Sequence, residues 1–284
     1  MRKKLTAAVL TVLLVLCLAA CGDKQEDEDI KKYDKVGKYD NDDKNPPTAS
    51  ADDLTKTPDA PTGTPTPTPK PHKFVVVLDP GHGGKDPGAG YDGRRESTLN
   101  LKLANMIRDY LMENYNNVTV YLTREDDVEL DPEKGPDLRA RVQVGVDLQA
   151  DIVVSLHLNA SENHKQHGSM VCISKQPNIT EQSKKLADCI LARLENLGLK
   201  NNGTLKRDSL DTFDDNGVPV DYYAICRHGA SNNLISIIVE SCFIDNDSDA
   251  KFLKTEEDLM KLAEAESKGI MEFLNQYYKG NGEG

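Results

Sequence analysis

From Lys73 onward, short continuous apolar runs alternate with segments whose apolar residues repeat every three or four positions. Such runs are typical of strands covered on both faces, and such repeats are typical of amphipathic helices. The predicted strands span residues 74–78, 118–123, 151–158, 168–174, 222–226 and 234–240. The predicted helices span residues 99–111, 138–149, 186–197 and 259–274. This order predicts an α/β fold, with a single mainly parallel twisted sheet of about six strands flanked by helices and ligands bound at the carboxyl ends of the strands.

The first residues indicate a targeting signal. Basic residues at positions 2–4 precede an apolar run over residues 5–18, which at about 14 residues is short for a bilayer core of ~30 Å. Residues 18–21, Leu-Ala-Ala-Cys, resemble a bacterial lipobox, which implies cleavage before Cys21 and lipidation of its thiol. The alternative is an ordinary signal peptide that leaves Cys21 as a plain thiol. We expect residues 1–20 to be a lipoprotein signal peptide, and the exported protein to be lipid-anchored to the outer face of the bacterial cell membrane.

Residues 21–72 contain almost no apolar clusters. An acidic run over residues 23–29 is followed by a Pro/Thr-rich stretch over residues 58–71. Such a composition buries too little apolar surface to fold, and its proline-rich part is stiff and extended. We therefore expect a disordered tether over residues 21–72 that holds a folded domain, residues 73–280, away from the membrane.

Charge and cysteine content argue against a nucleic-acid-binding protein and a disulfide-rich fold. The chain has 35 Lys and Arg residues against 47 Asp and Glu residues, a net charge of −12, so it lacks the basic surface of a nucleic-acid-binding protein. Six cysteines in 284 residues are too few for a disulfide scaffold. Three of them, Cys172, Cys226 and Cys242, lie in predicted strands and are expected to be small buried side chains. We expect no disulfide among these three and Cys189.

Histidine and carboxylate residues stand at the ends of the predicted elements. The first strand runs into a glycine-rich turn around His82, and Glu96 opens the next helix. His157 lies near the end of the strand over residues 151–158, and Glu240 closes a run of β-branched residues. Two histidines and one carboxylate suit a catalytic zinc site with one position left for water. A carboxylate such as Glu240, buried without a partner, would be costly unless it handles water, a metal or a proton.

These motifs, taken in order, resemble the zinc-dependent N-acetylmuramoyl-L-alanine amidase family of cell-wall hydrolases. They are residues 79–84 (Asp-Pro-Gly-His-Gly-Gly), Glu96, residues 155–160 (Ser-Leu-His-Leu-Asn-Ala) and residues 239–246 (Val-Glu-Ser-Cys-Phe-Ile-Asp-Asn). The resemblance covers residues 74–278 and implies that His82, Glu96 and His157 bind one Zn²⁺ per chain. It implies that Glu240 is the catalytic carboxylate. The implied reaction is hydrolysis of the amide bond between N-acetylmuramic acid and L-alanine in peptidoglycan by a zinc-activated water.

Two other functions stay open on the sequence. One is a non-catalytic peptidoglycan-binding lipoprotein on the same fold, and the other is a zinc peptidase or deacetylase acting on another wall substrate. The complete set of ligand residues favours an enzyme, because a descendant without activity is expected to have lost a ligand. We expect a monomer whose partners are peptidoglycan and, through Cys21, the membrane.

The remaining candidate residues have less specific predictions. His164 and His167 lie in a polar loop and are expected to be exposed, with substrate contact as the alternative. His228 lies in a turn-rich stretch before Glu240, where a place on the pocket rim is the alternative to a structural role. Arg124 and Arg139 are expected to orient loops through carboxylates, with substrate binding as the alternative. Residues 208–220 resemble an insertion relative to the family.

Overall fold

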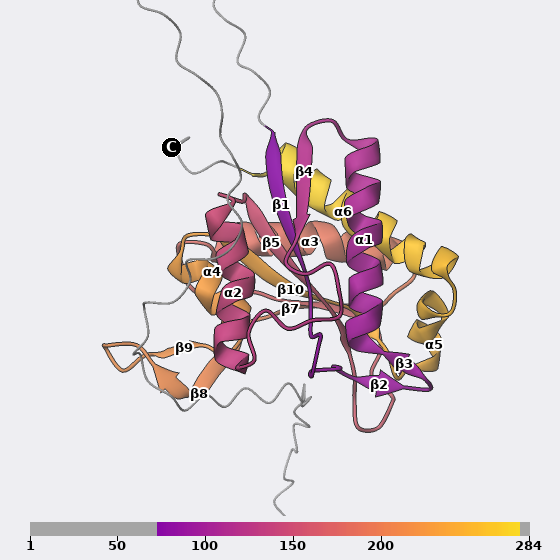
Figure 1. Ribbon diagram of the computed structural model, residues 1–284, viewed down its shortest axis with the longest axis horizontal. Coiled ribbons are helices and arrows are strands. Elements are labelled where there is room, and N and C mark those ends of the chain that lie inside the picture. The colour runs from indigo at the N-terminus through magenta and orange to yellow at the C-terminus, as the bar shows by residue number, and fades with distance from the viewer. Residues whose placement is uncertain (1–72, 279–284) are drawn as a thin grey trace, which may run out of the picture. The chain divides into compact units, whose positions relative to one another are not determined.

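The computed structural model describes residues 73–278. A six-stranded sheet forms the centre of this part of the chain. In spatial order its strands are β4 (Val118–Leu122), β1 (Phe74–Pro80), β5 (Ile152–Asn159), β10 (Ile235–Phe243), β6 (Ser169–Cys172) and β7 (Asn201–Leu205). β6 is antiparallel to β10, and the other neighbouring pairs are parallel. The predicted α/β fold with a mainly parallel sheet of about six strands is therefore confirmed (Figure 1).

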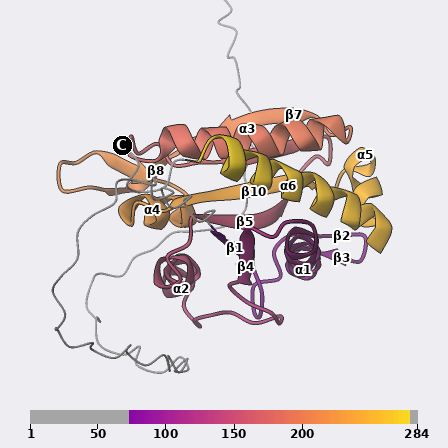
Figure 2. The same cartoon turned by 90° about the horizontal axis from the view of Figure 1, so that it is seen from above.

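Helices cover both faces of this sheet (Figures 1 and 2). The main helices are α1 (Glu96–Asn114), α2 (Lys134–Asp147), α3 (Thr180–Asn196), α4 (Ala224–Ser231) and α6 (Glu256–Gln276). One apolar core joins the sheet to α1, α3 and α6, and a second joins it to α2 and α4. In β1, Val76 and Leu78 belong to the first core and Val77 to the second. Burial on both faces explains why the strands are continuous apolar runs.

Short elements gather near the carboxyl ends of the central strands. A two-residue hairpin, β2 (Gly90–Tyr91) with β3 (Arg94–Arg95), leads into α1. The predicted insertion forms a second hairpin, β8 (Asp208–Phe213) with β9 (Pro219–Asp221). Figures 1 and 2 show the two hairpins on opposite sides of the same end of the sheet. After β10, α5 (Asp247–Ala250) and a 3₁₀ turn (Lys251–Leu253) lead into α6.

The prediction of a strand over residues 222–226 is wrong. This segment enters α4, whose buried residues Ile225, Cys226, Gly229 and Ala230 follow the helical period. At eight residues the helix is too short for its period to stand out from an apolar run. The sixth strand is instead β7, a polar edge strand with the sequence Asn-Asn-Gly-Thr-Leu.

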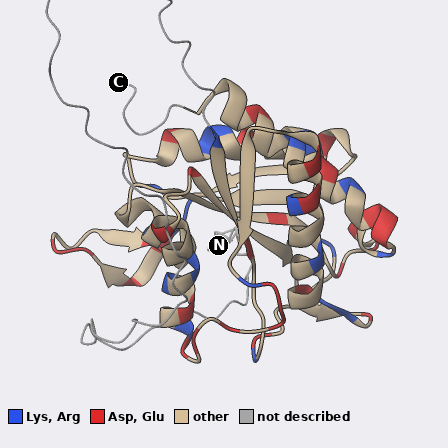
Figure 3. Ribbon diagram, turned by 45° about the horizontal axis from the view of Figure 1, so that its top comes forward, with Lys and Arg blue, Asp and Glu red and all other residues tan. Residues whose placement is uncertain are grey.

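The described residues include four buried cysteines and helices with charged side chains. Cys172, Cys189, Cys226 and Cys242 are all buried, and the structure pairs none of these four in a disulfide. Figure 3 shows Lys and Arg interspersed with Asp and Glu along the helices. Between residues 73 and 278, none of the helices combines the length and the apolar character needed to cross a membrane.

Candidate active site

Three predicted ligand residues converge from three separate elements. His82 lies two residues after the end of β1, Glu96 is the first residue of α1, and His157 lies in β5. Oε1 of Glu96 is 3.2 Å from Nε2 of His82 and 3.1 Å from Nδ1 of His157. One potential ligand atom from each of the three residues lies within 4.8 Å of the other two. The structure thus brings together residues that are far apart in the sequence, with donor atoms close enough to share one cation.

The backbone around His82 is shaped for this approach. His82 itself has a φ of 61°, in the left-handed region that residues other than glycine rarely adopt. A Cβ on Gly81 would lie 2.2 Å from Nε2 of His157. Glycine is therefore required at position 81, because the imidazole of His157 packs directly against the turn.

Hydrogen bonds fix the carboxylate of Glu96 between the two imidazoles. Its Oε2 accepts from the N–H of Ala89 at 2.7 Å, and its Oε1 accepts from the N–H of Leu158 at 3.0 Å. Burial acts to raise the pKa of Glu96, but hydrogen bonds from His157 and His82 hold it well below its usual range. The carboxylate is therefore ionised and aimed at the point where a cation would lie.

His82 is oriented from its other ring nitrogen. Nδ1 of His82 lies 2.9 Å from Oδ2 of Asp86. Burial acts to lower the pKa of His82, but the hydrogen bonds to Asp86 and Glu96 outweigh it and raise the pKa to about 10. A carboxylate that orients a ligand histidine in this way is common around metal sites. The cluster therefore favours a positive charge, which a proton or a metal ion can supply.

Glu240 lies beside this cluster on the neighbouring strand. It pairs in register with His157 across β10 and β5, so both side chains stand on the same face of the sheet. The residue is 8 % exposed. Burial raises the pKa of its carboxyl to about 7, against the lowering effect of His157 and with a further raising effect of Glu96. A carboxyl that exchanges its proton near neutral pH can serve as a general base and then as a general acid.

Arg124 and Arg141 hold the turn that carries His82. Nε of Arg124 donates to the carbonyl of Pro80 at 2.8 Å, and its Nη2 donates to that of Gly81 at 3.1 Å. Nη2 of Arg141 donates to the carbonyl of His82 at 3.0 Å. Three consecutive carbonyls thus accept from two buried guanidinium groups.

The role expected for the arginines needs correction. Arg124 orients the turn through backbone carbonyls, not through a carboxylate. Arg139 is exposed, and Arg141, which the sequence analysis missed, makes the carboxylate contacts. It bonds Asp137 at 2.7 Å and Asp79 at 2.9 Å. The spacing of Asp137 and Arg141, four residues apart on one helix, was the signal that could have identified this pair.

A groove of about 190 Å³ opens beside His82 and His157. The start of α2, including Leu138, lines one part of it, and Tyr222 and Tyr223 line another. The two tyrosines directly follow the β8–β9 hairpin. The β8–β9 hairpin therefore leads into one wall of the groove, which His82 and His157 also line.

The other candidate residues lie outside the ligand cluster. His164 and His167 are exposed, as expected. His228 lies in α4, not in a loop, and it is not among the described residues that line the groove.

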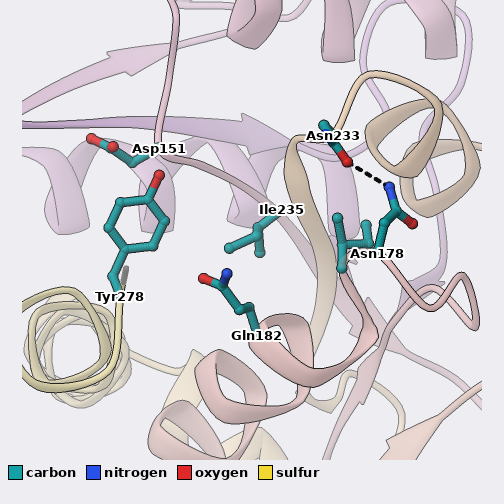
Figure 4. A pocket seen from close by; sticks show the side chains of 7 residues that line it. Asp151, Asn178, Gln182, Asn233, Ile235 and Tyr278 are labelled. Carbon is teal, nitrogen blue, oxygen red and sulfur yellow. Dashed lines mark hydrogen bonds between the residues drawn. The ribbon is translucent and has the colours of Figure 1, made fainter. Parts of the chain in front are cut away.

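A second cavity, of about 90 Å³, lies at the opposite ends of the strands. In Figure 4, the hydroxyl of Tyr278 points toward Asp151, and Asn178 bonds to Asn233. The lining of this second cavity includes Ile235, the first residue of β10, whereas His157 and Glu240 lie toward the carboxyl ends of their strands. This cavity is therefore remote from His82 and Glu240.

Residues 76–272 match the family described as N-acetylmuramoyl-L-alanine amidase. The chain belongs to this family. Amidases of the family hydrolyse the amide bond between N-acetylmuramic acid and L-alanine in peptidoglycan, so this is the reaction of the chain. The amidase family and the hydrolysis of this amide bond, both expected from the four motifs, are confirmed.

Individual amidase relatives cover most of the folded part. The endolysin of Bacillus phage SPP1 is 31% identical over 210 residues, which are 73% of this chain and 69% of the endolysin. The germination-specific N-acetylmuramoyl-L-alanine amidase of Bacillus subtilis is 30% identical over 211 residues, 71% of this chain and 80% of that protein. The CwlD amidase from Clostridioides difficile, solved in complex with the GerS lipoprotein, superimposes with a TM-score of 0.58 at 28% identity, covering 71% of this chain and 98% of CwlD.

Proposed function

We propose that the amidase is zinc-dependent and that His82, Glu96 and His157 hold one Zn²⁺. The observation that carries this proposal is the convergence of two imidazoles and one ionised carboxylate within 4.8 Å. Two nitrogen ligands and one oxygen ligand are a donor set typical of catalytic zinc, which keeps a further position for water or substrate. A zinc ion held there would act as a Lewis acid toward the scissile carbonyl and would make the attacking water more acidic.

The protein groups supply positioning and proton transfer. Glu240 takes a proton from the attacking water and delivers it to the amine of L-alanine as the amide bond breaks. Its position in register with His157 places it next to the ligand cluster. Asp86 orients His82, and the two arginines fix the turn that carries it, so these groups hold the ligand residue in place.

A lipid anchor at Cys21 completes the proposal. Cys21, the signal peptide over residues 1–20 and the tether over residues 21–72 lie outside the described residues, so their support is the lipobox-like sequence and the composition. An anchored monomer on the outer face of the membrane would reach the peptidoglycan through the tether. The anchor would then supply the localisation near the wall.

Digestion of purified peptidoglycan tests this function. Zinc-loaded protein should release fragments with free L-alanine amino termini and no new reducing sugar ends, as assigned by mass spectrometry. The same protein stripped with a chelator should leave the wall intact and regain activity when zinc is restored. An intact wall with zinc-loaded protein would favour the binding lipoprotein. New termini at other amide bonds would favour a zinc peptidase or deacetylase.

A further inference from the structure

A second group of side chains lies beside the ligand residues, and its interpretation rests on the proposed function. The group consists of His164 in the loop over residues 160–168, Tyr91 in the β2–β3 hairpin, and Asp245 just after β10. Nδ1 of His164 is 2.8 Å from Oδ2 of Asp245. The ring centroids of Tyr91 and His164 are 4.9 Å apart. Three segments distant in sequence thus meet at one imidazole.

Several hydrogen bonds fix the position of His164, although it lies in a surface loop. Asp245 is 4% exposed, and the same Oδ2 accepts from the N–H of Ser161 at 2.9 Å. Nδ2 of Asn246 donates to the carbonyl of His164 at 3.1 Å. The φ of His164 is 55°, in the left-handed region. Its side chain is nevertheless 52% exposed, so these contacts orient an imidazole that faces solvent.

This group borders the ligand residues. Tyr91 lies two residues after Ala89, whose N–H donates to Glu96 at 2.7 Å. The residue before Asp245 donates its N–H to the carbonyl of Asn159, the last residue of β5, at 2.9 Å. The β2–β3 hairpin lies on the side of the sheet end opposite the β8–β9 hairpin (Figure 1). The ligand residues therefore have the groove on one side and the His164 group on the other.

The hydrogen bond between Nδ1 of His164 and Asp245 determines what the other ring nitrogen, Nε2, can bind. The carboxylate of Asp245 accepts from Nδ1–H, so the neutral imidazole presents Nε2 as a hydrogen-bond acceptor. We propose that His164 is a substrate-binding residue that accepts a hydrogen bond from an N–H or O–H of peptidoglycan outside the reacting amide. Asp245 is its positioning residue. The donor is either an amide N–H of the stem peptide or a hydroxyl of the glycan.

Substrates of different extent test this role. Zinc-loaded full-length protein would be assayed on N-acetylmuramoyl-L-alanine, on the same core extended to a tripeptide, and on the core extended by one N-acetylglucosamine. The wild type should cleave an extended substrate with a higher kcat/KM than the core. His164→Ala should lower that gain about tenfold and leave the core unchanged. Asp245→Asn should act in the same direction, because an amide no longer selects the tautomer with Nδ1–H.

A matched control is available on the same loop. His167 is exposed and bonds the carbonyl of Lys165 through Nδ1, so His167→Ala should keep the full gain. Wild-type zinc content and Tm in His164→Ala would show that the ligand cluster and the fold are intact.

The two extensions separate the two donors. Loss of the stem gain identifies an amide N–H, and loss of the glycan gain identifies a hydroxyl. An equal loss on core and extended substrates, or no loss, would overturn the inference. A wild type without any gain would overturn it while leaving the amidase reaction in place. A wild type that cleaves none of the three would contradict the proposed function and the inference together.

Discussion

Glu266 on α6 should make the protein less stable as pH rises toward neutrality. Its side chain is 0% exposed, and its Oε1 accepts from the hydroxyl of Ser241 at 2.5 Å. Oε2 is buried without a hydrogen-bond partner among the described residues. Burial raises the pKa of Glu266 to about 7, and the hydrogen bond from Ser241 only partly opposes it.

The sign and size of the effect follow from this pKa. The folded protein holds the proton up to a pH of about 7, whereas the unfolded chain releases it near 4.5. Stability from this group is therefore complete below pH 4.5, declines as pH rises to about 7, and stays low above that. The difference between the two pKa values corresponds to about 3 kcal/mol in the free energy of unfolding.

Replacement of Glu266 by Gln should remove this pH dependence. Urea unfolding of zinc-saturated wild type and Glu266→Gln would be compared from pH 5 to pH 8. The free energy of unfolding of the variant relative to wild type should rise with pH up to about 7, because only wild type loses the contribution of Glu266. Any constant cost of the buried amide cancels in this comparison. Glu264→Gln, at a partly exposed position on the same helix paired with Lys268, should show no such rise. A flat difference for Glu266→Gln would mean that Glu266 is ionised in the folded protein throughout, contrary to our reasoning.

The remaining predictions concern the metal, the proton and the anchor. His157→Ala should lose zinc and activity, because three protein ligands leave none to spare; a variant that keeps stoichiometric zinc by elemental analysis would remove His157 from the site. Glu240→Gln should keep zinc but lose at least about 10²-fold in kcat, because an amide cannot carry the proton; near wild-type turnover would assign the transfer to another group. Cys21→Ser should abolish labelling by radioactive palmitate; equal labelling of both proteins would contradict lipidation at Cys21.

Strands buried on both faces were the most predictable part of the fold. β1, β5 and β10 are continuous apolar runs, because each contributes to the two cores. β7 and α4 were not predicted. β7 is a polar edge strand held by pairing with β6, and its sequence carries no apolar pattern. α4 packs so closely on β10 that a Cβ on Gly229 would lie 2.3 Å from Oγ of Ser236, a contact that no local period encodes.

The candidate ligands were predictable because each stands in a short local motif next to the end of a strand or the start of a helix. The residues that hold these ligands in place could not be predicted. Asp245 and His164 are 81 positions apart in the sequence, and no local sequence pattern predicts their contact. A buried arginine that bonds backbone carbonyls also leaves no signature, because every residue type offers the same acceptor.

The contacts of Arg124 show why these supports decide the geometry of the site. Its Nη2 bonds the carbonyl of Gly81 at 3.1 Å and that of Ser97 at 2.9 Å. Gly81 directly precedes His82, and Ser97 directly follows Glu96. One guanidinium therefore fixes the distance between two ligand residues that are 14 positions apart. Without it, the two carbonyls would lose the donor that they share, and the turn and the helix could separate. The spacing of the two candidate ligand residues therefore depends on a residue outside their cluster.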